Sequence, residues 1–229
     1  MPITFPDTRP PDDRTRPFLH QPAGWLADVT APSWADFARS WDDLPVDGHM
    51  ADGGTYRRRR YGAFRLAGGD LVRLPHAPHF QETDHNPLNG GVERWFDPIA
   101  PATVATAPFA TIVARTAALV GGEADWRIEA HQFRISAGPG APGLPTPEGM
   151  HRDGRDRVLI VLVGSANLRG GVTTIEDGAG RPLARHRLAA PGEALLLDDA
   201  RVRHGTSPIE RIDPALPAWR DTLVLTFAR

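Results

Sequence analysis

Two histidines and one aspartate are the residues whose types and spacing point most directly to chemistry. His151 and Asp153 flank a single arginine, and His204 follows further along the chain in a strand-like stretch. Residues i and i+2 of an extended chain point to the same side, so His151 and Asp153 can present an imidazole and a carboxylate together. Two histidines and one carboxylate form the facial triad that binds ferrous iron and leaves coordination positions open. These three residues are therefore candidate metal ligands.

Arg220 is the candidate anchor for an organic cofactor at such a metal. It stands at the start of the last apolar segment of the chain. A guanidinium binds a carboxylate through two parallel hydrogen bonds, which suits the far carboxylate of a 2-oxo acid such as 2-oxoglutarate. Thr206 and Ser207 can add hydroxyl donors nearby. Arg211 is the alternative anchor, closer to His204 but inside a proline-bounded loop.

A run of four arginines, 57–60, supplies candidate substrate contacts. In a strand Arg57 and Arg59 face one side, and the other two arginines face the opposite side. One pair is expected to be solvated or salt-bridged, while the other can hold a substrate carboxylate. We take Arg57 and Arg59 as the candidate pair, although the alternation by itself leaves the choice of face open.

Three more polar residues are candidate substrate contacts. Gln132 and Arg134 alternate with His131 and Phe133 on one predicted strand, so one of the two sets must face inward. If the inward set is the first, both side chains contact the substrate or the cofactor; otherwise they form the wet face of an ordinary strand. Glu148 precedes the His151 motif and is a candidate substrate contact, a partner for a ligand histidine, or a simple loop residue.

The composition excludes several other chemistries. The chain has 229 residues, no cysteine, and 26 basic residues that are all arginine. It therefore has no thiol nucleophile, disulfide, thiolate-bound metal, lysine Schiff base or P-loop. A formal net charge of −2 gives no overall attraction to nucleic acid or an anionic membrane. With no long apolar run and no signal-like N-terminus, we expect a cytoplasmic protein that does not interact with membranes.

Short strands are the elements that must position these residues. Turn formers, drawn from 23 glycines and 23 prolines, separate apolar segments in the C-terminal half. This spacing predicts an antiparallel sandwich or barrel. The Gly/Pro-rich loop 138–149 leads into His151. The predicted strands are 126–135, 157–163, 171–177, 183–188, 193–199, 201–206 and 220–228.

The N-terminal half predicts two helices and two further strands. Helical spacing of apolar residues covers 33–44, with Ser33 as the N-cap, and 108–122, where glycines end the helix. Strands are expected at 54–66 and 71–74, and residues 1–32 are expected to be irregular.

From about residue 56 to the C-terminus, the sequence resembles the bacterial Fe(II)/2-oxoglutarate dioxygenases that hydroxylate free amino acids, the L-isoleucine dioxygenase-like family. The segment PEGMHRDG, together with GGVT and RHGTSPI, is far more specific than the His-x-Asp pair alone. The segments that carry the resemblance are TYRRRRYGAF, QETDHNPLNGGVERWF, HQFRI, PTPEGMHRDG, NLRGGVTTIED, DDARVRHGTSPI and RDTLVLTF.

The resemblance implies a mostly β fold with flanking helices, built on a double-stranded β-helix, the cupin-like jelly-roll. The length of the chain predicts a single domain, and we expect residues 1–50 to pack as an irregular and helical segment on a dioxygenase core at 51–229. The resemblance also implies Fe(II) held by His151, Asp153 and His204, and 2-oxoglutarate held by Arg220.

The expected reaction is hydroxylation of an unactivated C–H bond of a free L-amino acid or close derivative, with O₂ consumed and succinate and CO₂ released. Two alternatives remain open from the sequence: a peptide or protein substrate, and a non-catalytic cupin-like protein that binds a metal or small molecule.

Overall fold

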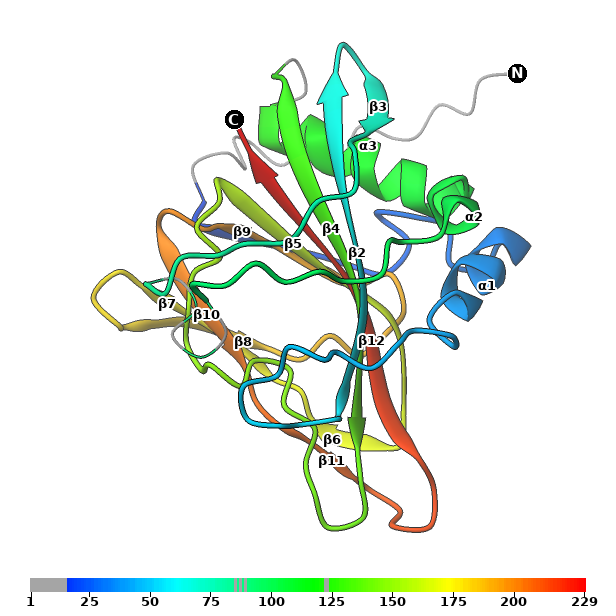
Figure 1. Cartoon of the computed structure of the whole chain (residues 1–229), viewed down its shortest axis with the longest axis vertical. Coiled ribbons are helices and arrows are strands. Elements are labelled where there is room, and N and C mark those ends of the chain that lie inside the picture. The colour runs from blue at the N-terminus through cyan, green and yellow to red at the C-terminus, as the bar shows by residue number, and fades with distance from the viewer. Residues whose placement is uncertain (1–15, 85, 87, 89, 122–123) are drawn as a thin grey trace.

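Antiparallel β structure dominates the chain in the computed structural model, which describes residues 16–84, 86, 88, 90–121 and 124–229 (Figure 1). The elements in chain order are β1 (Phe18–Gln21), α1 (Pro32–Arg39), β2 (Arg57–Ala67), β3 (Asp70–Arg73), α2 (Pro101–Val104), α3 (Ala107–Gly121), β4 (Trp126–Ala137), β5 (Arg157–Ala166), β6 (Leu168–Gly170), β7 (Thr173–Asp177), β8 (Pro182–His186), β9 (Ala194–Asp198), β10 (Val202–Thr206), β11 (Ile209–Arg211) and β12 (Ala218–Ala228).

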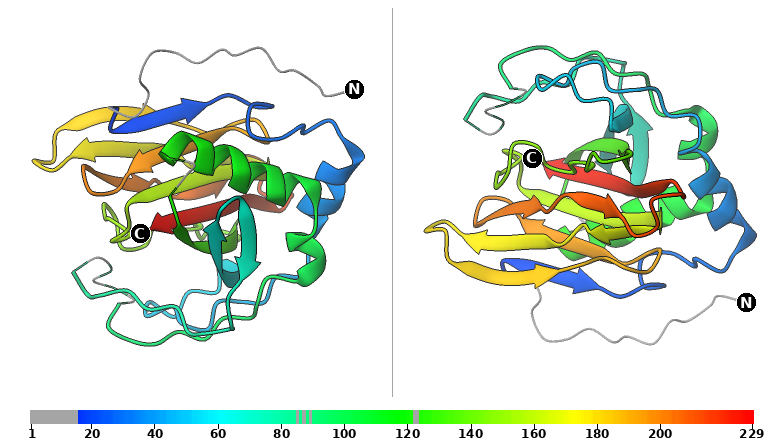
Figure 2. Two further views of the ribbon diagram at one scale, coloured as in Figure 1. Left: turned by 90° about the horizontal axis from the view of Figure 1, so that it is seen from above. Right: turned by 90° about the horizontal axis from the view of Figure 1, so that it is seen from below.

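The strands form one large sheet and two small ones. The large sheet has seven strands in the order β1-β9-β5-β12-β4-β2-β3, and the smaller sheets have the orders β10-β7-β8 and β11-β6. Every pairing between these strands is antiparallel. Figure 2 shows the three-stranded sheet lying across the end of the large sheet that carries β1 and β9. Neighbouring strands come from distant parts of the sequence, as a jelly-roll requires.

The two faces of the large sheet have different coverings because side chains alternate along each strand. On β5, Val158, Ile160 and Leu162 pack against the three-stranded sheet, where they meet Ile175 and Val202. The intervening residues of β5 face the helices and belong to the main core. Helix α3 supplies that core with Phe109, Ile112, Val113, Ala117 and Val120.

Helix α3 matches the prediction from the sequence, whereas α1 is shorter than predicted. Pro108 lies in the first turn of α3, and Gly121 ends the helix with a φ of 110°, a conformation that glycine adopts at little cost. Helix α1 begins at Pro32 with Ala31 as the N-cap, so the assignment of Ser33 as the cap is wrong. The helix ends at Arg39, and Trp41 and Leu44 reach the core from the non-helical segment that follows it.

Residues 16–50 contribute more structure than the sequence predicted. Residues 18–21 form strand β1 on the edge of the large sheet, although 1–32 were expected to be irregular. The first 15 residues of that segment lie outside the described part of the chain. The short elements α2, β6 and β11 were also not predicted, since three or four residues carry too little periodicity. No helix within the described ranges is long and apolar enough to cross a membrane.

Candidate metal centre and its cavity

Three central strands of the large sheet present one row of side chains to a cavity. In the strand register Arg57 and Arg220 both lie beside Ile135, while Arg59 and Thr222 both lie beside Phe133. The cavity has a volume of about 100 Å³. Its lining residues are Arg57, Arg59, His79, Gln81, Asn86, Arg94, His131, Phe133, Ile135, Pro145, Thr146, Glu148, His151, Asp153, Ile160, His204, Thr206, Arg220, Thr222 and Val224.

His151, Asp153 and His204 meet at one side of this cavity, as their types predicted. Backbone hydrogen bonds join His151 and His204 in both directions, each with an N–O distance of 2.9 Å. This places their imidazole centroids 4.4 Å apart. Nε2 of His204 lies 3.8 Å from Oδ2 of Asp153. One ligand atom from each residue lies within 4.8 Å of the other two, so the three side chains can surround one ion.

Asp199 fixes the loop that carries Asp153, and the sequence analysis missed it. Its carboxylate accepts hydrogen bonds from the backbone N–H groups of Asp153 and Arg155, both at 3.0 Å. The side chain is buried at the turn between β9 and β10, close to His204 in sequence. A buried carboxylate that holds another loop is a tertiary feature, and its position after a strand was the only signal available.

The histidine nitrogens fit a metal-binding role. Nδ1 of His151 lies 3.0 Å from the carbonyl oxygen of Gly149 and donates to it, so Nε2 keeps a free lone pair. Burial, and secondarily the charge of His151, lowers the pKa of His204 to about 3, so this imidazole is neutral at pH 7. Burial opposes the charged form of His151, but the carboxylates of Asp153 and Glu148 raise its pKa. A divalent cation such as Fe(II) binds to neutral imidazoles and carboxylates, and both kinds of group are present here.

Arg220 is buried in the wall of the cavity and has side-chain nitrogens available to bind an anion. Its Nε and Nη2 atoms have no hydrogen-bond partner among the described residues. Burial lowers the pKa of Arg220 to about 10, with Asp221 opposing the shift, so the group is still charged at pH 7. Thr206 also lines the cavity, whereas Ser207 does not and instead accepts a hydrogen bond from the backbone N–H of Val172.

The arginine run divides as strand alternation requires. Arg57 and Arg59 are buried on the cavity face. Nε of Arg57 donates to Oδ2 of Asp47 at 2.7 Å, and the guanidinium of Arg59 lies 3.6 Å from the centroid of the Phe96 ring. The other two arginines face the helix side, where Arg58 donates to the carbonyl oxygen of Leu44.

Of the other three candidate contacts, only Glu148 lines the cavity. Oε1 of Glu148 lies 3.6 Å from Nε2 of His151, and its Oε2 is buried without a hydrogen-bond partner in the described chain. Gln132 and Arg134 point to the helix side of the sheet instead: Gln132 donates to Ser40, and Arg134 pairs with Asp221. The alternating set that faces the cavity is therefore the one with His131 and Phe133.

The segment that covers the cavity supplies polar residues to which the sequence analysis gave no role. His79, Gln81, Asn86 and Arg94 all line the cavity. Nη2 of Arg94 donates to Oε1 of Gln81 at 2.9 Å, and Nε2 of Gln81 lies 3.4 Å from Oδ1 of Asp153. The unusual density of polar residues in this turn-rich stretch was the signal, but no periodicity showed which of them point inward.

Comparison with known proteins gives one family. A sequence profile described as 2OG-Fe dioxygenase matches residues 38–226. Among solved structures, a bsmA homologue from Methylobium petroleophilum PM1 is 37% identical, with a TM-score of 0.85 over 94% of this chain and 89% of that chain. No curated protein matches the sequence.

Two more distant structures share the fold. IDO from Bacillus thuringiensis is 20% identical, with a TM-score of 0.78 over 94% of this chain and 95% of that chain. The Fe(II)/α-ketoglutarate-dependent dioxygenase TqaL is 19% identical, with a TM-score of 0.73 over 94% of this chain and 83% of that chain. Together with the sheet topology, these similarities confirm the expected mostly β, jelly-roll class.

Proposed function

The chain belongs to the 2OG-Fe dioxygenase family, and on that premise we propose that it hydroxylates an unactivated C–H bond of a free L-amino acid or close derivative. Members of this family are oxidoreductases that use Fe(II) and 2-oxoglutarate. The proposed reaction consumes O₂ and releases succinate and CO₂ with the hydroxylated product.

The observation that carries the proposal is that charged side chains of both signs line one small cavity and each leave one atom without a hydrogen-bond partner among the described residues. Nη2 of Arg57 and Nε of Arg59 are buried without a partner in the described part of the chain, and so is Oε2 of Glu148. Buried polar groups are costly until they are hydrogen-bonded, so these atoms favour a ligand that brings both an anion and a cation. A free amino acid has a carboxylate and an ammonium group, whereas an internal peptide residue has neither.

We assign the metal to His151, Asp153 and His204, and the far carboxylate of 2-oxoglutarate to Arg220. The bound iron, with its 2-oxo acid, supplies the oxidising power that cleaves the C–H bond. Thr206 lines the same cavity and is a second candidate for contact with the cofactor, with its hydroxyl 2.9 Å from the hydroxyl of Thr173. The assignment is supported by the free Nε2 lone pair of His151 and by the Nε and Nη2 atoms of Arg220, which have no hydrogen-bond partner in the described part of the chain.

The remaining residues of the cavity orient the substrate and exclude water. Arg57 and Arg59 take the carboxylate of the substrate, while Glu148 takes its ammonium group beside the metal. Phe133 lies beside Arg59 in the sheet register, and its ring centroid is 4.6 Å from the guanidinium carbon of Arg59, a contact that helps to hold Arg59 in place. Fixing both charged ends of the substrate restricts which carbon can approach the metal.

The deciding experiment measures succinate release with Fe(II), 2-oxoglutarate and ascorbate across a panel of free L-amino acids. At least one is expected to stimulate succinate release well above the level without substrate. Its N-acetyl and C-amide derivatives should be poor substrates, because each removes one of the two charges. A peptide that is turned over when no free amino acid is would replace this proposal with a peptide hydroxylase.

Two variants separate the proposed substrate contacts. Glu148→Gln and Arg59→Met are each expected to raise KM for the amino acid by about tenfold or more, since each loses a charged hydrogen bond. Arg60→Met is the matched control, because Arg60 lies on the opposite face of β2 and pairs with Asp43. An unchanged KM in both cavity variants would contradict the zwitterion assignment.

A further inference from the structure

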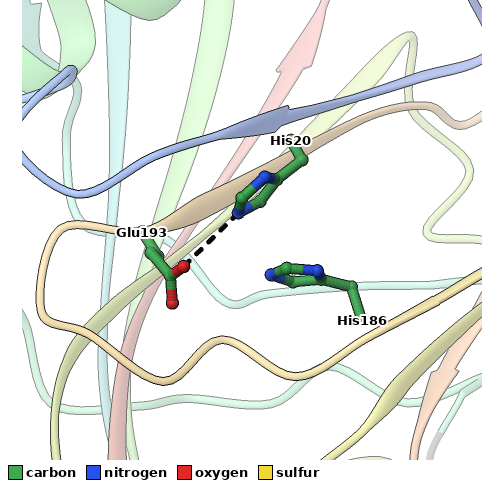
Figure 3. Close-up of side chains that lie close together, drawn as sticks. All are labelled: His20, His186 and Glu193. Carbon is green, nitrogen blue, oxygen red and sulfur yellow. Dashed lines mark ion pairs between the residues drawn. The ribbon is translucent and has the colours of Figure 1, made fainter.

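Three side chains with metal-binding chemistry meet on the rim of the molecule, and none of them lines the cavity. His20 comes from β1, His186 from the end of β8, and Glu193 from the turn before β9 (Figure 3). Strands β1 and β8 are the edge strands of the seven-stranded and three-stranded sheets. Figure 3 shows the three side chains pointing toward one another, so this rim cluster bridges the open edge between the two sheets.

The spacing in the rim cluster is that of metal ligands. Nε2 of His20 lies 3.6 Å from Oε1 of Glu193, which is too long for a hydrogen bond. Ligand atoms about 2.1 Å from a tetrahedral zinc ion lie roughly 3.4 Å apart. The rings of His20 and His186 have centroids 4.0 Å apart, and one ligand atom from each residue lies within 4.8 Å of the others. Small side-chain rotations bring all three atoms to one ion.

Hydrogen bonds from the described residues orient the rim cluster and leave ligand atoms available. Oε2 of Glu193 accepts hydrogen bonds from the backbone N–H groups of Ala189 and Ala190, which turns Oε1 toward the histidines. Nε2 of His186 is buried and has no hydrogen-bond partner in the described ranges. Burial, and then the nearby charge of His20, lowers the pKa of His186. A neutral imidazole with a buried, unsatisfied nitrogen beside an oriented carboxylate is what a divalent transition metal binds.

A third cluster of the same residue types shows why composition alone is not enough. His79, Glu129 and His131 also lie within ligand distance of one another. There, however, Arg94 Nη2 lies 3.0 Å from Nδ1 of His79, and Arg59 Nη2 lies 2.6 Å from Nδ1 of His131. A guanidinium only donates, so those nitrogens accept and the guanidinium charge repels a cation. The rim cluster has no such cation among the partners that the structure describes.

We propose that His20, His186 and Glu193 form a second metal site that binds Zn²⁺ and has a structural role. Two imidazoles and one carboxylate complete a tetrahedral zinc site with one water molecule. The side chain of His20 is 36% exposed, which leaves room for that water. Because the ligands come from β1, β8 and the turn before β9, the ion ties the N-terminal edge strand to the facing sheet. This site is independent of the reaction proposed above.

The test isolates the rim cluster by removing the other metal site. In metal-free protein that carries His151→Ala and His204→Ala, zinc is expected to bind at a 1:1 ratio in isothermal titration calorimetry. Saturating zinc should raise Tm by about 5 °C, as tight binding to the folded state alone implies. Adding His20→Gln should weaken zinc binding by at least tenfold and abolish most of the Tm shift. Adding His76→Gln instead, at an exposed histidine outside all three clusters, should change neither value.

A second measurement tests the site without the double variant His151→Ala/His204→Ala, in case that variant does not fold. Wild-type protein is expected to bind two zinc ions and the single variant His20→Gln one, with the far-UV circular dichroism spectrum unchanged. With Fe(II), His20→Gln should keep wild-type 2-oxoglutarate turnover, so failure of this site and of the proposed function are distinguishable. An equal number of bound zinc ions in the wild type and in His20→Gln overturns the proposal, as does a Tm shift that survives His20→Gln.

Discussion

At the scale of single residues, hydrogen bonding distinguishes the cavity residues Arg220 and Glu148 from Arg134. Arg220 and Glu148 each leave side-chain atoms buried without a hydrogen-bond partner in the described structure, and both face the cavity. By contrast, Arg134 faces the helix side, where Nε and Nη2 bond both carboxylate oxygens of Asp221. Both arginines were candidates from sequence, and what separates them is whether the protein itself satisfies the charge.

Replacing Arg220 tests the cofactor anchor directly. Arg220→Met is expected to raise the Kd or KM for 2-oxoglutarate by about 10–100-fold, because it removes charge-assisted hydrogen bonds. Metal affinity should stay unchanged. Arg211→Met is the control, since Arg211 donates to the carbonyl oxygens of Ala137 and Pro214. The assignment fails if Arg211→Met weakens 2-oxoglutarate binding and Arg220→Met leaves it intact.

Removing Arg134 should make stability depend on pH through Asp221. Burial raises the pKa of Asp221 to about 6, although the hydrogen bonds and charge of Arg134 oppose the shift. A folded pKa above the unfolded value of 3.8 means that ionisation of Asp221 disfavours the folded state, so this group gives more stability as pH falls below 6. In Arg134→Met the pKa of Asp221 rises further, and the ionised carboxylate is left buried without its partner.

The free energy of unfolding of Arg134→Met is therefore expected to fall short of wild type by about 3 kcal/mol at pH 8. The deficit should shrink as pH is lowered toward 5, because protonated Asp221 no longer needs a counter-charge. Urea unfolding at both pH values measures the difference. Arg39→Met breaks an exposed pair with Asp36 and should cost little at either pH. A deficit that is equal at the two pH values would contradict the role of Asp221.

At the scale of elements, the alternation of side chains was visible in the sequence but its direction was not. On β2 the sequence shows that Arg57 and Arg59 share a face, and on β4 that Gln132 and Arg134 do. Which face meets the cavity depends on what each sheet face packs against. Helices α1 and α3 cover one face with apolar residues, so the polar cavity forms on the other.

Asn167 shows how one residue joins two elements. It lies between β5 and β6 with a positive φ of 51°. Its Nδ2 donates to the carbonyl oxygens of Asp213 and Leu216, and its Oδ1 accepts from the backbone N–H of Asp213. The side chain therefore fixes the loop that leads from β11 into β12, the strand that carries Arg220.

We expect Asn167→Ala to lower the free energy of unfolding by about 2–3 kcal/mol, because it loses these hydrogen bonds and strains the backbone. Asn167→Gly loses the same hydrogen bonds but tolerates the positive φ, so it should be about 1 kcal/mol more stable than the alanine variant. Urea denaturation of the three proteins gives both differences. If the glycine variant matched wild type, the side-chain hydrogen bonds would not stabilise the loop.

At the scale of the whole molecule, the N-terminal segment belongs to the same core as the sheet. Leu26, Trp34, Phe37, Trp41 and Leu44 pack in one cluster with α3 and with β4, β5 and β12. Strand β1 also pairs with β9 and covers its edge. The boundary drawn at residue 50 therefore separates parts of a single hydrophobic core.

A fragment of residues 51–229 is accordingly expected not to fold cooperatively. It exposes the apolar face that α1 and its flanking turns cover, and each large apolar side chain removed from a core costs about 2–5 kcal/mol. Circular dichroism during thermal unfolding of the fragment and of the full chain provides the comparison. A cooperative transition of the fragment at the Tm of the full chain would contradict this expectation.

The sequence by itself determined the chemistry and the class of fold. The absence of cysteine confined a metal site to nitrogen and oxygen ligands, of which imidazole and carboxylate are the usual ones. The spacing of short apolar segments predicted most strands and α3, because periodicity is a local property that neighbouring residues share. The motifs around His151 and His204 predicted that His151, Asp153 and His204 lie together, and these residues do meet beside the cavity.

Only the tertiary structure decided which polar residues face one another. Asp199 holds the backbone of Asp153, which lies 46 residues away in the sequence, and His20 at the rim lies beside Glu193 from the opposite end of the chain. Burial and hydrogen bonding depend on contacts between strands that the chain brings together after long excursions. In the described part of the chain, three clusters of histidine and carboxylate have similar composition, and they differ in whether neighbouring guanidinium groups occupy their histidine nitrogens.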